Sequence, residues 1–266
     1  MKIIFWGTPE YSTKSLQSLI DSKYDVVAVV TQPDKKRLRG SNLIPSPIKK
    51  LSKLNNIPVL CPEKIKNNKD FITSLKSYNC DLFLVIAYGK ILSKEILDIP
   101  KYGSWNAHAS LLPRWRGAAP IQWSLLSGDK STGVGIMKME EGRDTGDILL
   151  EEEIRIENEE NLQTLHDKLS ILSSKLFLKA LEIISRNKFK GNVNLTPQKN
   201  KSREIKYARM INKTDYILKF DDDASNILKK VNGLYPHAYV IYKNKNLKVI
   251  KVRILSHSEI NNLNNK

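Results

Sequence analysis

The chain has 266 residues, a length that suits two domains better than one. Its hydrophobic content of 41% is enough for a packed core and disfavours general disorder. No apolar run approaches the roughly 20 residues that a membrane span needs, and the N-terminus reads as a strand rather than a signal peptide. We therefore expect no membrane association. Cys61 and Cys80 lack both metal-ligand spacing and the density of a disulfide scaffold, so we expect a reducing cytoplasm.

Positive charge is concentrated near the C-terminus. The net charge of the chain is +16, and the last 79 residues hold 17 Lys or Arg against 6 Asp or Glu. Such asymmetry suggests an appended module that meets a polyanion, above all a nucleic acid. Lys and Asn are abundant throughout the chain, so a general compositional bias accounts for the excess equally well. Both interpretations stay open on composition alone.

Apolar runs at residues 2–7, 26–31 and 81–88 predict buried strands, and a helical pattern separates the first two. Continuous apolar strands that alternate with amphipathic helices are typical of a parallel sheet covered on both faces. The sequence thus predicts an α/β, doubly wound, Rossmann-like first domain. We place this domain at residues 1–187, closed by a long helix at about 160–186.

Residues 104–110 alternate in the way that a half-buried strand does. Asn106, His108 and Ser110 then share one face of the strand, while the residues between them share the other. Further along, the pattern predicts a helix at about 118–127 and strands at 133–139 and 147–156.

The remainder of the chain changes character. Residues 188–206 are basic and show little periodicity, which predicts a linker that lies across the surface. Residues 207–266 form the second domain that we expect. It begins with a helix at about 224–232, continues with a hairpin within 238–255, and ends in a tail that we expect to be disordered.

No nucleotide-binding fingerprint accompanies the predicted fold. The segment FWGTPEYS at the first strand is not the G-x-G-x-x-G pattern, and no phosphate-binding P-loop is found, so NAD and ATP are disfavoured. The sequence also lacks H-E-x-x-H and any paired cysteines, so it indicates no metal.

The polar pair Asn106 and His108 indicates acyl-transfer chemistry. An amide and an imidazole on one strand face can polarise a carbonyl and stabilise the oxyanion of a tetrahedral intermediate. Such a centre also needs a proton acceptor, and the candidates are Asp144 and Asp147 in a Gly-flanked loop. Ser110 lacks a nucleophile elbow, so transfer between two bound substrates fits better than a covalent acyl-enzyme. The alternative is a purely structural role, in which His108 is a buried core residue and Asp144 is an ordinary turn residue.

Five segments in register carry a family resemblance. They are TQPD, RG and L-x-PSP-x-K within residues 31–49, VIAYGKIL at 85–92, N-x-H-x-SLLPRWRGAAPIQ at 106–122, TGV-x-IM-x-M at 132–139, and DTGD at 144–147. The chain resembles the methionyl-tRNA formyltransferases, a branch of the folate-dependent formyltransferases. The N-x-H…SLLP…D core is common to the whole family, whereas the TQPD and PRWRGAAP segments are more specific to the tRNA enzymes.

This resemblance implies a reaction and a catalytic set. The formyl group of 10-formyltetrahydrofolate passes to the α-amino group of methionine on initiator tRNA. Asn106 and His108 are expected to hydrogen-bond the formyl oxygen as it becomes an oxyanion. Asp144 is expected to orient His108 and to assist proton removal from the attacking amine.

The resemblance also implies binding residues and no metal. Those expected to line the folate site are Tyr88, Gly89, Leu92, Ser110, Leu111, Leu112 and Pro113. Those expected to meet the tRNA acceptor end lie in the 33–45 loop and are Arg39, Lys35, Lys36 and Arg37. A solvated charge run remains the alternative for that loop. Arg114 and Arg116, around Trp115, can either bind phosphate or hold a loop.

The C-terminal domain of this family is a small OB-like β-barrel, and its members are expected to be monomers. This chain ends soon after one predicted hairpin, so we expect a truncated β-rich domain at 207–266. Two other functions stay open. Formyl transfer to a small amine, such as an amino sugar or a purine-precursor amine, is favoured by the short C-terminus. RNA binding without catalysis is disfavoured by the intact Asn106, His108 and Asp144.

Overall fold

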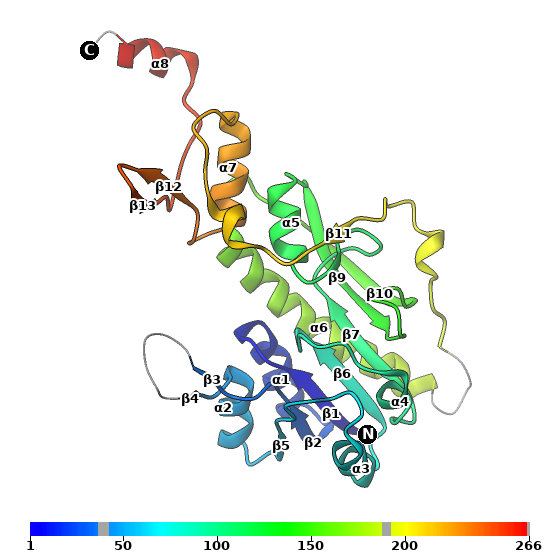
Figure 1. The fold of residues 1–266 in the computed structure, drawn as a ribbon. Helices are drawn as coiled ribbons and strands as arrows, with labels where there is room; N and C mark the ends of the chain where they lie inside the picture. Colours follow the sequence, from blue (N-terminus) through cyan, green and yellow to red (C-terminus); the bar gives the residue numbers. More distant parts are fainter. Residues whose placement is uncertain (37–42, 188–192, 265–266) are drawn as a thin grey trace.

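One mixed sheet organises the first two thirds of the chain in the computed structural model, which describes residues 1–36, 43–187 and 193–264 (Figure 1). Within these residues the sheet has seven strands, in the order β10 (Ile148–Arg155), β9 (Ser131–Lys138), β7 (Ser104–His108), β6 (Leu82–Ile86), β1 (Lys2–Gly7), β2 (Asp25–Val30) and β5 (Val59–Leu60). The strands from β7 to β5 are parallel, as the sequence predicts. β9 runs antiparallel to both of its neighbours, so the sheet ends in a hairpin at one edge.

Helices cover both faces of this sheet, which confirms the doubly wound prediction. Ile3 and Phe5 of β1 join a core that also includes residues of α1 (Thr13–Ile20) and α6 (Leu162–Asn187). The alternate β1 residues Ile4 and Trp6 join a second core on the opposite face. The remaining helices of the domain are α2 (Pro47–Leu54), α3 (Lys69–Ser77), α4 (Lys94–Leu97) and α5 (Pro120–Leu126), with the short 3-10 turn η1 (Glu10–Ser12).

β7 shows the same alternation, and it decides where the polar side chains lie. Trp105 and Ala107 are buried in the core under α6. Asn106 and His108 therefore face the other side of the sheet, as the alternation in the sequence predicts. His108 is the last residue of β7, the strand at which the parallel part of the sheet ends. In open α/β sheets, ligands bind at such carboxyl ends of strands.

The C-terminal part is built around α7 (Ala224–Gly233), which lies beside α5 (Figure 1). Gly233 permits this approach, because a Cβ there would lie 3.1 Å from Leu126 Cγ. The predicted hairpin is present as β12 (Tyr239–Tyr242) and β13 (Lys245–Lys248). Its two turn residues both have positive φ angles, as a type I′ hairpin turn requires. In the described part of this domain the hairpin does not continue into a closed barrel.

One expectation for the C-terminal third needs correction. The tail predicted to be disordered forms helix α8 (His257–Asn264). The described part of the predicted linker lies against the first domain, where Thr196 pairs with Ile148. Directly after the linker, β11 (Tyr207–Ala208) runs parallel to β8 (Arg116–Gly117). Figure 1 shows this segment passing along β10 before it reaches β11. The short elements not yet named are β3 (Lys35–Lys36), β4 (Leu43–Ile44), η2 (Gln198–Asn200) and η3 (Lys213–Tyr216).

No helix in the described residues is both long enough and apolar enough to cross a lipid bilayer.

The packing of helix α6 against the core can be tested by mutation. Phe177 is fully buried beneath it, whereas Ile171 on the same helix is 48% exposed. Truncating Phe177→Ala should lower the free energy of unfolding by about 3–5 kcal/mol, because it removes buried apolar area and leaves a cavity. The matched control Ile171→Ala should change it by about 0.5 kcal/mol or less. Urea denaturation of the three proteins measures both values, and equal effects of the two changes would contradict this packing.

Candidate active site

His108 is held between a backbone carbonyl and a carboxylate. Its Nε2 lies 2.8 Å from the carbonyl oxygen of Trp115. Because a carbonyl oxygen can only accept, Nε2 carries the hydrogen of this bond. The other ring nitrogen, Nδ1, lies 3.9 Å from Oδ1 of Asp144. His108 is 6% exposed, so the orientation of its ring is set by these partners and by the surrounding chain.

Asp144 reaches His108 from the loop that joins β9 to β10. Its second carboxylate oxygen, Oδ2, accepts a 2.8 Å hydrogen bond from the backbone N–H of Gly117. Asp144 has a φ of 54°, in the left-handed region. Two residues later Gly146 passes so close to β9 that a Cβ would lie 1.7 Å from Lys138 O. The loop therefore depends on a glycine at 146 to bring the carboxylate to its place.

Of the two candidate carboxylates, the structure brings Asp144 to the imidazole. Within the described residues, Asp144 is the acidic side chain that lies within 4 Å of His108. Asp147 instead continues the sheet, since its backbone carbonyl accepts a 2.9 Å hydrogen bond from Lys138 N–H.

Asn106 presents an uncommitted amide on the same strand face. It is half-buried between Val85 and Met137, its neighbours on the adjacent strands. Its side-chain amide has no hydrogen-bond partner among the described residues, so both N–H groups are available to a ligand. A free amide donor, an imidazole and a carboxylate on one face can bind a carbonyl oxygen and accept a proton beside it.

The segment 110–113 follows β7 and is almost wholly buried. Ser110 is fully buried, and its hydroxyl donates a 2.7 Å hydrogen bond to the carbonyl of Arg114. Leu112 lies in a small core with Met137 and Ile148. The Ser110 hydroxyl is thus already engaged in holding the turn. The assignment of Ser110, Leu111, Leu112 and Pro113 to a folate wall stays a prediction.

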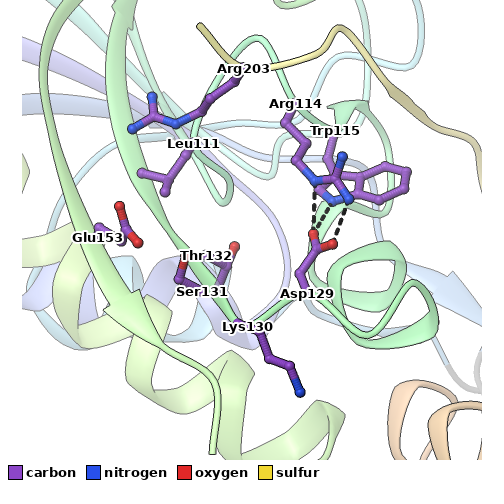
Figure 2. A pocket seen from close by; sticks show the side chains of 9 residues that line it. All are labelled: Leu111, Arg114, Trp115, Asp129, Lys130, Ser131, Thr132, Glu153 and Arg203. Carbon is purple, nitrogen blue, oxygen red and sulfur yellow. Dashed lines mark hydrogen bonds and ion pairs between the residues drawn. The ribbon is translucent and has the colours of Figure 1, made fainter. Parts of the chain in front are cut away.

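A cavity of about 250 Å³ lies beside this segment and is drawn in Figure 2. Leu111 lines it, whereas Asn106, His108 and Asp144 are not among the lining residues. On one of its walls the Asp129 carboxylate accepts hydrogen bonds from the guanidinium of Arg114 and from the indole N–H of Trp115 (Figure 2).

The two arginines around Trp115 both have structural partners. Arg114 stacks over the Trp115 ring at 4.7 Å from its centroid while it pairs with Asp129. Arg116 donates two hydrogen bonds to Oε1 of Gln198. Of the two alternatives raised by the sequence, holding the loop is therefore the one that these contacts support.

In the turn 88–92, which is predicted to contact folate, the side chains of Tyr88 and Leu92 lie in the core. Tyr88 and Leu92 are each 2% exposed, whereas Ile91 is 69% exposed. Burial raises the pKa of the Tyr88 phenol, whose oxygen has no hydrogen-bond partner among the described residues. Gly89 has a φ of 83°, and a Cβ there would lie 2.6 Å from Nε2 of Gln32. A ligand could therefore contact Tyr88 or Leu92 only through their backbone atoms, or after the turn had rearranged.

The predicted tRNA loop is described only at its base. Lys35 is exposed on β3, which pairs with β4 across the loop. Lys36 belongs to the same strand, but Arg37 and Arg39 lie outside the described residues. Below the loop, Lys49 Nζ forms an ion pair of 2.7 Å with Asp34, and this hydrogen bond raises the pKa of Lys49.

Sequence reasoning missed the groups that hold the catalytic set in place. They are the Trp115 carbonyl on His108, the Gly117 N–H on Asp144, and the Gln198 amide, which donates to the carbonyls of Asp144 and Gly146. Backbone groups carry no sequence signal of their own. Gln198 stands in a segment without periodicity, 54 residues beyond Asp144.

Family profiles match both parts of the chain. A profile described as "Formyl transferase" matches residues 1–181, and one described as "Formyl transferase, C-terminal domain" matches residues 210–263. The solved structure of a 4-N formyltransferase from Francisella tularensis superposes with a TM-score of 0.71 at 18% identity, covering 93% of this chain and 96% of that one. A phosphoribosylglycinamide formyltransferase from Bacillus halodurans superposes with a TM-score of 0.59 at 24% identity, covering 72% of this chain and all of the other.

Relatives of much higher identity were also found. A protein named methionyl-tRNA formyltransferase from Prochlorococcus marinus subsp. pastoris is 62% identical over all of this chain and 81% of its own length. One of the same name from Synechococcus sp. strain WH7803 is 45% identical over 94% of this chain and 74% of its own length. The chain therefore belongs to the formyl transferase family and, within it, to the methionyl-tRNA formyltransferases.

Proposed function

We propose that this chain transfers the formyl group of 10-formyltetrahydrofolate to the α-amino group of methionine esterified to initiator tRNA. The product would be formylmethionyl-tRNA for bacterial-type translation in the cytoplasm. The observation that carries this proposal is the 62% identity to a methionyl-tRNA formyltransferase over the whole chain. The cluster of Asn106, His108 and Asp144 supports it, because its groups suit acyl transfer to an amine.

In the proposed mechanism, Asn106 donates from its free amide to the formyl oxygen as negative charge develops there. His108 is the second donor. Its Nε2–H is engaged by the Trp115 carbonyl, so Nδ1 is the nitrogen left to donate to the formyl oxygen, which it does when the ring is protonated. Asp144 Oδ1 lies 3.9 Å from Nδ1, a distance at which the carboxylate stabilises the charged ring without taking up the Nδ1–H. Asp144 thereby orients the ring and assists removal of the proton from the attacking amine.

The balance of the reaction needs only this proton transfer. The donor supplies the formyl carbon, a new bond joins that carbon to the amine nitrogen, and its bond to the folate nitrogen breaks. One proton leaves the amine and one ends on the folate nitrogen. An α-amino group has a pKa of about 7.7–8.0, and lower when the carboxyl is esterified, so a modest base suffices at neutral pH.

Two further assignments follow the family. Folate is assigned to the turn containing Tyr88, Gly89 and Leu92 and to the wall 110–113. The half-buried Asn106 amide, which has no hydrogen-bond partner among the described residues, is compatible with a polar ligand on this face. A relative structure, the N-formyltransferase from Helicobacter canadensis, was solved in complex with folinic acid and dTDP-3-aminofucose; it has a TM-score of 0.66 at 19% identity, over 94% of this chain and 86% of that one.

Initiator tRNA is assigned to the basic second domain and to the 33–45 loop. We propose the division into residues 1–187, 188–206 and 207–266, with the last unit as the tRNA-binding domain. Its basic charge suits a substrate whose contacts are mostly to phosphate. At the loop, Lys35, Lys36, Arg37 and Arg39 are assigned to the acceptor end.

The proposal is tested by an assay with purified protein, 10-formyltetrahydrofolate and initiator Met-tRNA. Formylated Met-tRNA is the expected product, and uncharged tRNA with free methionine is the control that should stay unmodified. A TDP-linked amino sugar belongs in the same assay, because related structures include a sugar N-formyltransferase with a TM-score of 0.68. Formylation of the amino sugar without formylation of Met-tRNA would overturn the proposal.

Substitutions of His108 and Asp144 should lower the turnover number. His108→Ala and Asp144→Asn should each lower kcat at least ~10²-fold, the scale of a lost acid–base or oxyanion contact. Steady-state kinetics with Met-tRNA measures both, and Asp147→Asn is the matched control in the same loop. Wild-type turnover in His108→Ala or Asp144→Asn would remove that residue from the mechanism.

Substitution of Arg39 in the 33–45 loop should affect the kinetics with tRNA and leave those with folate unchanged. Arg39→Ala should raise KM for Met-tRNA, because it removes a cation assigned to the acceptor end, while KM for the folate donor stays unchanged. The exposed Lys69→Ala on α3 is a control for the loss of one positive charge elsewhere. Unchanged kinetics with tRNA in Arg39→Ala would assign this arginine to a solvated charge run.

A further inference from the structure

The side-chain amide of Gln198 is buried, although the sequence predicts that this segment is a linker on the surface. Gln198 is 4% exposed, although Lys199 and Asn200 beside it on η2 are exposed. Burying an amide costs free energy unless its polar atoms are hydrogen-bonded. The position of Gln198 therefore implies a set of specific partners.

Those partners use the whole hydrogen-bonding capacity of the side chain. Oε1 accepts from Nε and Nη2 of Arg116, at 3.0 and 2.7 Å. Nε2 donates to the carbonyl of Asp144 at 2.9 Å and to that of Gly146 at 2.8 Å. A primary amide offers two donors and two acceptor sites, and all four are filled. The reverse orientation would place its NH2 group against a guanidinium, so the partners fix the amide.

The contacts join the two segments that hold the catalytic carboxylate. The carbonyls of Asp144 and Gly146 belong to the loop that carries this carboxylate. Arg116 directly precedes Gly117, whose N–H binds the same carboxylate. The amide thus spans the loop and its anchor. Pairing of Thr196 with Ile148 and of β11 with β8 fastens the segment on either side of Gln198.

We propose that Gln198 is a positioning residue for formyl transfer: its side-chain amide holds the Asp144 loop so that the carboxylate faces Nδ1 of His108. This inference rests on the proposed function for its kinetic consequence. Its structural part, the placement of Asp144 beside His108, does not depend on which amine accepts the formyl group.

The kinetic test compares variants of Gln198 in the full chain. Gln198→Ala should lower kcat about 10- to 100-fold, the scale of a small misplacement in an active site, with little change in KM for either substrate. Gln198→Glu keeps the acceptor for Arg116 but turns an oxygen toward the two carbonyls, so it should lose as much. Gln198→Met keeps the side-chain length and replaces Gln198→Ala if that variant melts below the assay temperature. Asn200→Ala, on the same turn, is the control that should keep wild-type kcat.

A spectroscopic test is independent of the reaction. The chain has four histidines, so NMR of protein with isotope-labelled histidine gives few ring signals, and His108→Ala identifies that of His108. Gln198→Ala should shift the His108 ring signals in the same direction as Asp144→Asn does, and leave the other three in place. Unmoved His108 signals, or wild-type kcat in Gln198→Glu, would overturn the inference. Failure of the wild-type protein to formylate Met-tRNA would instead sink the proposed function, and the NMR comparison would still decide the role of Gln198.

Discussion

The hydrogen bond from Gly117 N–H to the Asp144 carboxylate is the contact on which the site depends. The carboxylate comes from a loop between antiparallel strands, whereas His108 ends a parallel strand. The hydrogen bonds of the sheet do not by themselves bring these two groups together. The loop does so only because Gly146 tolerates contact with β9 and because Gly117 offers its N–H at the right place. These backbone groups fix the Asp144 carboxylate, so that it and the His108 imidazole form an oriented pair.

The second domain takes part in this arrangement from its first residues. The segment leading to it pairs with β10 at Thr196, and its own first residues, Tyr207 and Ala208, pair with β8. α7 then lies beside α5, which begins a few residues after Gly117. The chain that connects the domains thus crosses the region that orients Asp144. For an enzyme proposed to act on the end of a large polyanion, this fixes the basic domain relative to the reacting groups.

The sequence predicted the sheet from continuous apolar runs, which are typical of strands buried on both faces. Successive residues of a strand lie on opposite faces, as Ile4 and Phe5 of β1 show by joining opposite cores. The sequence predicted the Asn106 and His108 face for the same reason. It left Asp144 and Asp147 unresolved, since the loop path depends on close contacts at Gly146 that spacing does not encode. It missed Gln198 because one amide in an aperiodic segment carries no pattern, and it wrongly predicted a disordered tail where α8 forms.

The central claim is that His108 and Asp144 work as one unit, and a double-mutant cycle on kcat tests it most directly. The measurement compares formyl transfer to Met-tRNA by the wild type, His108→Ala, Asp144→Asn and the double variant. Residues that act as a unit give strongly non-additive effects. The account predicts that the double variant is no slower than the slower single variant, within about 3-fold. Full additivity of the two losses, in free energy, would contradict the pairing and assign the two residues independent roles.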